Sequence, residues 1–126
     1  MSQVLDQHQY HNLHAYVAQP KFRRNKEGKG LLYLMQDKLC FYCRQWFTIT
    51  DLTIDHFVPL AEQGGNELSN KVVACWECNH AKGSRLPTQP ELQRHARLLV
   101  RLAEELRRLE GQMQMASDEA NRCKVS

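Results

Sequence analysis

Apolar residues recur at helical spacing in three segments of the chain and gather in short runs between them. The periodic segments are 3–18, which is followed by Pro20, then 31–39 and 88–117. The last segment has an apolar residue every seven positions, at Leu92, Leu99, Leu106 and Met113. We therefore expect two short helices before the middle of the chain and one long helix after it.

Short runs of β-branched and aromatic residues predict strands in the middle of the chain. Residues 46–50 read WFTIT, residues 52–54 read LTI, and residues 72–74 read VVA. We expect the last two runs to pair as a hairpin, and a helix to follow from Cys75 to Gly83. Trp46 and Phe47 are expected in the core, rather than as platforms on which nucleic-acid bases stack. The predicted fold class is α+β.

The apolar seam of segment 88–117 is compatible with two arrangements. It could form a coiled-coil homodimer, or it could lie back on its own domain. We favour packing on its own domain, because Gly111 and the short length make a free coiled coil marginal. Five arginines lie outside the seam: Arg94, Arg97, Arg101, Arg107 and Arg108. A solvated face is the default interpretation of these arginines, and contact with a DNA backbone is the alternative.

A mild basic excess distinguishes the composition. The 126 residues carry a formal net charge of +3, which permits a polyanionic partner without demonstrating one. Segment 21–30 concentrates positive charge on Lys21, Arg23, Arg24, Lys26 and Lys29, against a single glutamate. Taken with the motif described below, this segment is interpreted as an arm that contacts nucleic-acid phosphates; a solvated basic linker is the alternative.

The first ten residues are polar and do not resemble a secretory signal peptide. No apolar run approaches the length that crosses a bilayer. We therefore expect a soluble, cytoplasmic protein, in which cysteines are metal ligands rather than disulfide partners.

Two Cys-x-x-Cys pairs frame the middle of the chain, Cys40 with Cys43 and Cys75 with Cys78. Each pair can place two thiolates on one tetrahedral ion, so the two pairs together predict a closed structural zinc site. The fifth cysteine, Cys123, has no partner at such a spacing and is expected to be an exposed thiol.

Four polar residues of a different kind lie between and beside the cysteine pairs: Asp55, His56, Asn70 and Asn79. A carboxylate, an imidazole and two amides are the groups of a hydrolytic site with a hard metal ion, not of a second zinc site. His56 is the natural general base, because an imidazole with a reference pKa of about 6.5 can accept a proton at neutral pH.

The segment from Cys40 to Gly83 resembles the HNH (ββα-metal) endonucleases, in the version framed by a zinc knuckle of four cysteines. The resemblance rests on several features in order. These are both cysteine pairs, an Asp-His dipeptide with a proline shortly after it, a central asparagine, and a final Cys-Asn-x-x-Lys-Gly. It implies a small zinc-stapled ββα-metal (HNH, His-Me finger) core that hydrolyses DNA phosphodiester bonds and leaves a 5′-phosphate end.

The resemblance also implies roles for the polar residues. His56 matches the first histidine of the motif, and Asn70 falls in the region that supports it, by its side chain or by loop geometry. Asp55 and Asn79 match the positions that hold the catalytic divalent ion, which oxygen ligands suit to Mg²⁺ or Mn²⁺. Many members of the family have a histidine where Asn79 stands, and this chain has the asparagine variant. A softer ion such as Ni²⁺ or Zn²⁺ is the alternative.

Two further residues of the final motif have open interpretations. His80 could be a third metal ligand or a phosphate contact, although adjacent helical residues point about 100° apart. Lys82 could contact a phosphate of the nucleic acid, or it could be a solvent-facing lysine near the end of a helix.

We expect four parts along the chain: an N-terminal helix and basic arm at 1–30, an HNH nuclease domain at 31–86, an amphipathic helix at 87–117 and a flexible tail at 118–126. The predicted function is that of a divalent-metal-dependent DNA endonuclease. One alternative is a non-catalytic zinc-knuckle module that binds nucleic acid. The other is a module for protein interaction through the C-terminal helix.

Overall fold

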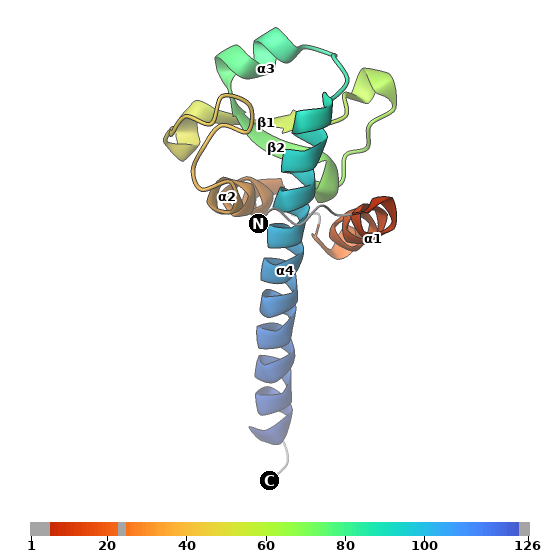
Figure 1. The fold of residues 1–126 in the computed structure, drawn as a ribbon. Coiled ribbons are helices and arrows are strands. Elements are labelled where there is room, and N and C mark those ends of the chain that lie inside the picture. The colour runs from red at the N-terminus through yellow and green to blue at the C-terminus, as the bar shows by residue number, and fades with distance from the viewer. Residues whose placement is uncertain (1–5, 23–24, 124–126) are drawn as a thin grey trace.

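A two-stranded antiparallel hairpin lies at the centre of the computed structural model, which describes residues 6–22 and 25–123. Strand β1 (Leu52–His56) pairs with β2 (Lys71–Cys75), in a register that places Leu52 opposite Cys75 and His56 opposite Lys71. Helix α3 (Trp76–Lys82) follows β2 directly and packs on both strands (Figure 1). The predicted α+β class with a ββα core is therefore confirmed.

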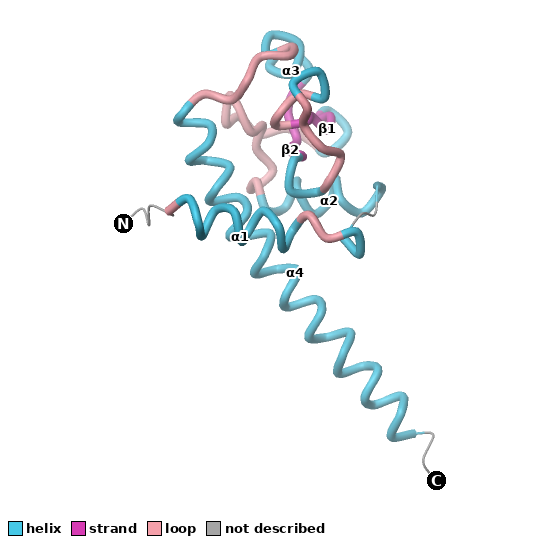
Figure 2. The backbone as a smooth tube through the Cα atoms, turned by 90° about the vertical axis from the view of Figure 1, so that its right-hand side faces the viewer, coloured by secondary structure: helices cyan, strands magenta, loops and turns pink. Residues whose placement is uncertain are grey.

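Three further helices surround this core. They are α1 (Gln7–Val17), α2 (Asn25–Met35) and α4 (Gln89–Cys123). Helices α1 and α2 lie on either side of α4 and pack against it (Figure 1). The C-terminal end of α4 extends away from the rest of the molecule, which a second view confirms (Figure 2). The chain thus combines a small mixed core with a long helix that reaches beyond it.

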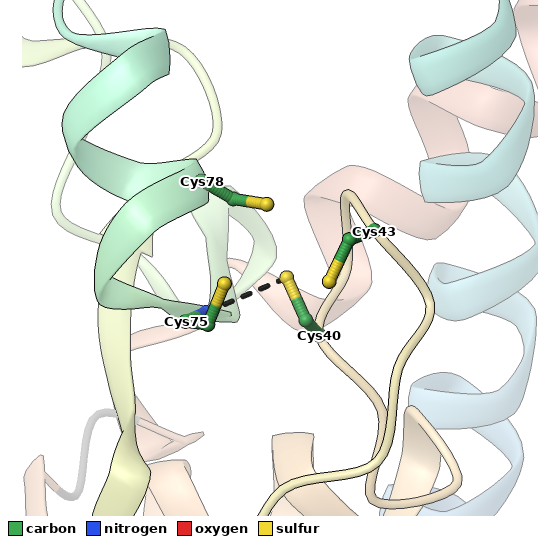
Figure 3. Close-up of side chains that lie close together, drawn as sticks. All are labelled: Cys40, Cys43, Cys75 and Cys78. Carbon is green, nitrogen blue, oxygen red and sulfur yellow. Dashed lines mark hydrogen bonds between the residues drawn. The ribbon is translucent and has the colours of Figure 1, made fainter.

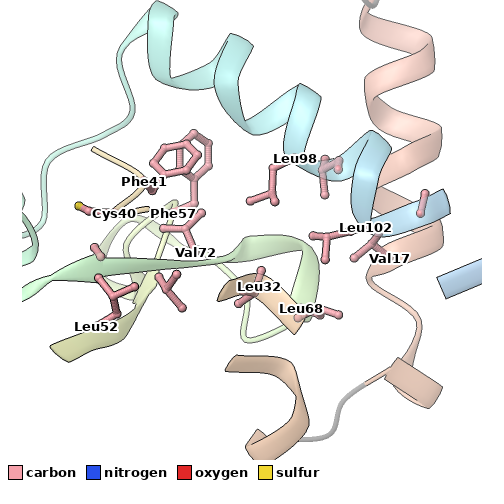
Figure 4. Close-up of a cluster of buried hydrophobic side chains, with 14 of the residues drawn as sticks. Val17, Leu32, Cys40, Phe41, Leu52, Phe57, Leu68, Val72, Leu98 and Leu102 are labelled. Carbon is pink, nitrogen blue, oxygen red and sulfur yellow. The ribbon is translucent and has the colours of Figure 1, made fainter. Parts of the chain in front are cut away.

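The hydrophobic core lies where α4 meets the hairpin and α2 (Figure 4). Leu52 of β1, Leu32 of α2 and Leu99 of α4 are each fully buried. The predicted packing of the long helix on its own domain is confirmed over this half, where Leu102 is 1% exposed. Further along the same seam Met113 is 67% exposed, so the apolar positions of α4 are covered in the first half of the helix and open in the second.

Several element boundaries differ from the prediction. The helix expected at 31–39 begins at Asn25 and ends at Met35, because Asp37 and Lys38 have φ of 57° and 66°, outside the helical region. The predicted boundary between an arm and a domain at residue 30 therefore falls inside α2. The long helix runs to Cys123, past the expected end at residue 117. Among the described residues, no helix has the length and apolarity that a membrane span requires.

The run at residues 46–50 is not a strand. It contributes one isolated bridge, between Leu39 and Trp46, and then a short 3-10 turn. The expectation that Trp46 is buried is wrong, since Trp46 is 62% exposed whereas its neighbour Phe47 packs against the core. Adjacent residues of an extended chain point to opposite sides, so Phe47 can face inward only if Trp46 faces outward.

Candidate active site and metal centre

The four paired cysteines converge at one point (Figure 3). Cys40 and Cys43 lie in the loop that follows α2, whereas Cys75 ends β2 and Cys78 lies in the first turn of α3. Their sulfur atoms all lie within 4.8 Å of one another. A tetrahedral zinc ion with Zn–S bonds of about 2.3 Å separates its sulfur ligands by about 3.8 Å, so a small contraction suffices to hold the ion. The residues fit the predicted zinc site.

Hydrogen bonds and burial set the charge of this cluster. Burial raises the pKa of Cys40, but hydrogen bonds from backbone N–H groups, including those of Cys75 and Tyr42, outweigh burial and bring its pKa below the ordinary value. Burial, with the neighbouring sulfur atoms, raises the pKa of Cys43 and Cys78. Thiols packed so closely become thiolates together only beside a cation, which is the role a zinc ion would have.

Strand β1 divides the predicted catalytic residues between its two faces. Thr53 and Asp55 are two residues apart and both contact α3, which covers their face of the hairpin. His56, the last residue of the strand, instead contacts the loop that joins β1 to β2. The prediction that Asp55 and His56 point to opposite faces therefore matches the geometry.

Asp55 is 7% exposed and is held by two donors on the same oxygen. Its Oδ2 accepts hydrogen bonds from the Tyr42 hydroxyl at 2.5 Å and from Lys82 Nζ at 2.9 Å. Within the described part of the chain, Oδ1 of Asp55 takes part in no hydrogen bond, and no fully buried side-chain oxygen lacks a partner. One carboxylate oxygen thus fixes the side chain and the other remains accessible as a ligand.

Lys82 is not the surface phosphate contact that the sequence predicts, nor a solvent-facing lysine. Its side chain is 1% exposed, because α3 lays it across the end of β1. Besides Asp55, its Nζ donates to the backbone oxygen of His56 at 2.7 Å. Lys82 therefore joins the helix to both residues of the Asp-His dipeptide, through the side chain of Asp55 and the backbone of His56.

Asn79 and His80 differ in their surroundings although they are adjacent on α3. The Asn79 amide donates from Nδ2 to Thr53 Oγ1 at 3.1 Å, and this contact assigns the orientation of the amide. Its Oδ1 is then the atom left to accept or to bind a cation. The His80 ring instead stacks on Trp76, with ring centroids 4.8 Å apart, on the exposed side of the helix.

The imidazole of His56 is half-buried, and its Nε2 lies 2.9 Å from Asn66 Oδ1. An amide oxygen can only accept, so Nε2 carries the proton and Nδ1 keeps a free lone pair. Sequence reasoning missed Asn66, because its place after Gly64 and Gly65 indicates a turn and no contact with a histidine. The residue that orients the imidazole belongs to the predicted loop but is not Asn70.

Asn70 braces that loop. It is 3% exposed, and its Oδ1 accepts from Val58 N at 2.8 Å while its Nδ2 donates to Val58 O at 3.0 Å and Gly65 O at 2.8 Å. The two ends of the loop come so close that a Cβ at Gly64 would lie 1.8 Å from Val58 O and 2.9 Å from Asn70 Nδ2. The side chain of Asn70 therefore closes the loop, while the hydrogen bond to the His56 imidazole comes from Asn66.

A comparison with protein families identifies the segment that carries this site. The model of the HNH endonuclease family matches residues 40–85, which include both cysteine pairs and every residue of the site just described. Residues 40–85 are an HNH endonuclease domain. No curated protein and no solved structure matched the chain.

A buried histidine outside the HNH domain supports it from α4. His95 is 1% exposed, accepts at Nδ1 from the Tyr10 hydroxyl at 2.7 Å and donates from Nε2 to Ser69 O at 2.9 Å. Its ring stacks on Phe57 with centroids 4.1 Å apart. Burial lowers the pKa of His95 to about 3, so the ring is neutral. His95 thus contacts Phe57 and Ser69, the neighbours of His56 and Asn70. The sequence could have indicated this residue, because His95 is a polar residue on the apolar seam, four positions before Leu99.

The predicted basic arm is described only in part. Lys21 forms an ion pair with Glu110 of α4, with 2.8 Å between Nζ and Oε2. Arg23, Arg24 and the side chain of Lys26 lie outside the described residues, as does the side chain of Cys123. The charge of Lys21 is thus shared with an acidic partner on the protein itself.

Proposed function

We propose that this protein is a metal-dependent DNA endonuclease, in which the HNH domain hydrolyses phosphodiester bonds and His56 is the general base. The HNH domain itself indicates nuclease activity in general. The observation that carries the finer proposal is the bond between His56 Nε2 and Asn66, because it leaves Nδ1 as the proton acceptor of a half-exposed imidazole. A base of this kind takes the proton of a water molecule that attacks the phosphorus.

The remaining residues position this base. Lys82 holds the backbone oxygen of His56, and Asn70 closes the loop from which Asn66 reaches the imidazole. His95 stacks on Phe57 from the other side. The backbone of His56, its ring and the neighbouring Phe57 are therefore each held in place. Because the imidazole is already oriented, it loses little conformational freedom when the substrate binds.

Two oxygen atoms support a divalent ion on the α3 side of the strand. They are Oδ1 of Asp55 and Oδ1 of Asn79, each left open by a hydrogen bond that fixes the rest of its side chain. Hard oxygen donors of this kind suit Mg²⁺ or Mn²⁺, as the chemistry of the donor set predicts. When bound, such an ion neutralises charge on the phosphate and on the departing 3′ oxygen. In this scheme the four-cysteine zinc site has a structural role, since it anchors the start of the helix that carries Asn79.

A plasmid-nicking assay tests the proposal. Zinc-loaded protein is compared with added Mg²⁺, with added Mn²⁺ and without either ion, and His56→Ala is expected to lower the cleavage rate by about 10²- to 10⁴-fold. His11→Ala is the matched control, because His11 is an exposed histidine of α1 remote in sequence from the HNH domain. Zinc content and circular dichroism of each variant show whether the fold is kept. Cleavage that persists in His56→Ala would exclude this residue as the base.

One observation favours a second function, that of a nucleic-acid-binding module without catalysis. Lys82 Nζ lies 2.9 Å from Asp55 and supplies the positive charge that a divalent ion would bring. If the ammonium replaces the ion, the protein should bind DNA without cutting it under any metal. Titration of Mg²⁺ or Mn²⁺ into the protein separates the cases, since the endonuclease binds the ion and Asp55→Ala abolishes that binding.

A further inference from the structure

Four arginines from two separate elements line one cavity at the edge of the zinc knuckle. The cavity has a volume of about 200 Å³ and lies between α4 and the segment 35–44. Arg44 comes from the knuckle loop, and the other three come from successive turns of α4: Arg94, Arg97 and Arg101. None of these residues belongs to the catalytic cluster described above.

Positive charge in this cavity is largely uncompensated. Arg101 forms an ion pair with Asp37, at 2.9 Å. Within the described ranges, no carboxylate lies within ion-pair distance of Arg44, Arg94 or Arg97. Burial lowers the pKa of Arg94, and the charges of Arg44 and Arg97 lower it further, which agrees with like charges gathered around it. A solvated helix face would spread its arginines apart; here two elements bring them together.

One of the four is fixed and two are free to reach a ligand. Arg94 Nη1 donates to Phe41 O at 2.6 Å, and its guanidinium lies over the Phe41 ring, 5.5 Å from the centroid. Arg44 and Arg97 are exposed and have no side-chain hydrogen bond within the described ranges. A fixed guanidinium with exposed ones at the rim of the cavity suits a phosphate group, which arginine binds through paired N–H donors.

We infer that this cavity, which we call the arginine pocket, binds a phosphate of the DNA backbone away from the bond that is cut. The inference rests on the proposed function for the choice of DNA as ligand. The pocket and the active site share the knuckle loop, because Arg94 also contacts Tyr42 O and the Tyr42 hydroxyl binds Asp55. A duplex held in the pocket is thereby held against the loop that shapes the active site. Such contacts fix position and orientation and carry no sequence information.

Binding of a fluorescent 20-base-pair duplex, followed by anisotropy, tests the inference. Zinc-loaded full-length His56→Ala protein serves as background, so that cleavage does not interfere. Arg44→Ala with Arg97→Ala should weaken binding roughly 10- to 60-fold at 0.1 M salt, because each lost phosphate contact removes about 0.9 from the slope of log K against log salt. The slope itself should fall by about 2.

Arg107→Ala with Arg108→Ala is the matched control, since it removes two exposed arginines of α4 that do not line the pocket. This control should stay within about threefold of the background in affinity. Equal loss of DNA affinity in both double variants would mean that the duplex is attracted to the charge of α4 in general, and would overturn the inference. Unchanged affinity and slope in the Arg44/Arg97 pair would overturn it as well.

A second measurement separates this inference from the proposed function. Bis(p-nitrophenyl) phosphate is a small diester that occupies the reaction centre alone. In the otherwise unaltered chain, Arg44→Ala with Arg97→Ala should keep the rate of this hydrolysis and lose plasmid cleavage. If the unaltered chain hydrolyses neither substrate, the proposed function fails, whereas the anisotropy result still decides the pocket. Loss of both activities in a variant that retains zinc would show that the arginines serve the reaction centre and would overturn a role in DNA positioning alone.

Discussion

The HNH domain and helix α4 are stabilised by different kinds of interaction. The strands β1 and β2 have five residues each and α3 has seven, and besides the apolar side chains that the strands bury, their positions depend on four cysteines and on single polar bonds such as that between Lys82 and Asp55. Helix α4 has 35 residues and is held over its first half by leucines. Elements too short to bury much apolar surface need ligands and specific hydrogen bonds, while a long helix needs a stripe of apolar side chains.

The two regions meet through polar residues of α4. Arg94 reaches the knuckle loop at Phe41, and His95 reaches the loop before β2 at Ser69. These adjacent residues contact two different segments of the HNH domain. The leucines therefore fix where α4 lies, and the polar residues fix how the HNH loops lie against it.

The largest effect is expected from breaking the zinc cluster. Cys75→Ser should prevent stable folding of the HNH domain, because a structural zinc site contributes about 10 to 16 kcal/mol of apparent binding energy to folding. Helical signal from α1 and α4 should persist in part. Mass spectrometry measures the zinc content. Near-ultraviolet circular dichroism measures the tertiary structure, and far-ultraviolet circular dichroism measures the helical signal. Cys123→Ser, outside the two Cys-x-x-Cys pairs, should change none of them; a cooperative fold in Cys75→Ser would contradict the scheme.

A smaller effect is expected from the leucines, and it should differ between the halves of α4. Leu102→Ala should lower the free energy of unfolding by about 2 to 5 kcal/mol, because Leu102 is 1% exposed and its loss leaves a cavity. Met113→Ala should change it by no more than about 0.5 kcal/mol, since Met113 is 67% exposed. Urea denaturation of zinc-loaded protein measures both values. A large effect at Met113 would indicate a second chain packed on that half of the helix.

The smallest effect is expected from acid, through His95. Its pKa is about 3 in the folded protein, below the ordinary value of 6.5, so the stability it contributes is complete above pH 6.5 and is lost as the pH falls towards 3. At about 1.4 kcal/mol per pH unit, the free energy of unfolding should fall by about 2 kcal/mol between pH 6.5 and pH 5. Part of any slope belongs to His14, whose pKa burial also lowers.

His95→Gln should flatten this part of the profile, because glutamine offers a donor and an acceptor but does not titrate. His11→Gln, at an exposed position of α1, should keep the profile of the unaltered chain. Denaturation at constant free zinc between pH 6.5 and pH 5 makes the comparison. A profile that is equally steep in His95→Gln would assign the acid sensitivity to another group.

The sequence predicts those features that depend on spacing. Cysteines three positions apart chelate one ion in any fold that keeps the spacing, and a seven-residue leucine repeat makes one helical stripe, so the metal cluster and the packing of α4 could be foreseen. The burial of Lys82 could not, because it depends on Tyr42 and Asp55 meeting the end of α3 in three dimensions. Residue spacing predicts a helix and its faces. Whether a long side chain such as that of Lys82 is buried depends on the polar groups of other elements that lie near it.

The orientation of the His56 imidazole was also beyond the sequence. Asn66 follows two glycines, a pattern that indicates a turn, and its contact with His56 depends on how tightly that turn closes. Trp46 is a second example. Its extended segment forms only an isolated bridge, so the sequence pattern does not show which of its side chains face the core. In each case the missing information is tertiary.

The close approach at Gly64 has a consequence for relatives of this chain. The space that a side chain would need at position 64 is filled by the Val58 carbonyl and by the Asn70 amide. The Val58 carbonyl is the nearer obstacle, so a relative can accept a side chain at position 64 only if the loop moves away from Val58. The hydrogen bonds from Asn70 to Val58 and Gly65 oppose that movement. Positions 64 and 70 should thus vary together through evolution, and their joint identity would mark which members of the family close this loop in the same way.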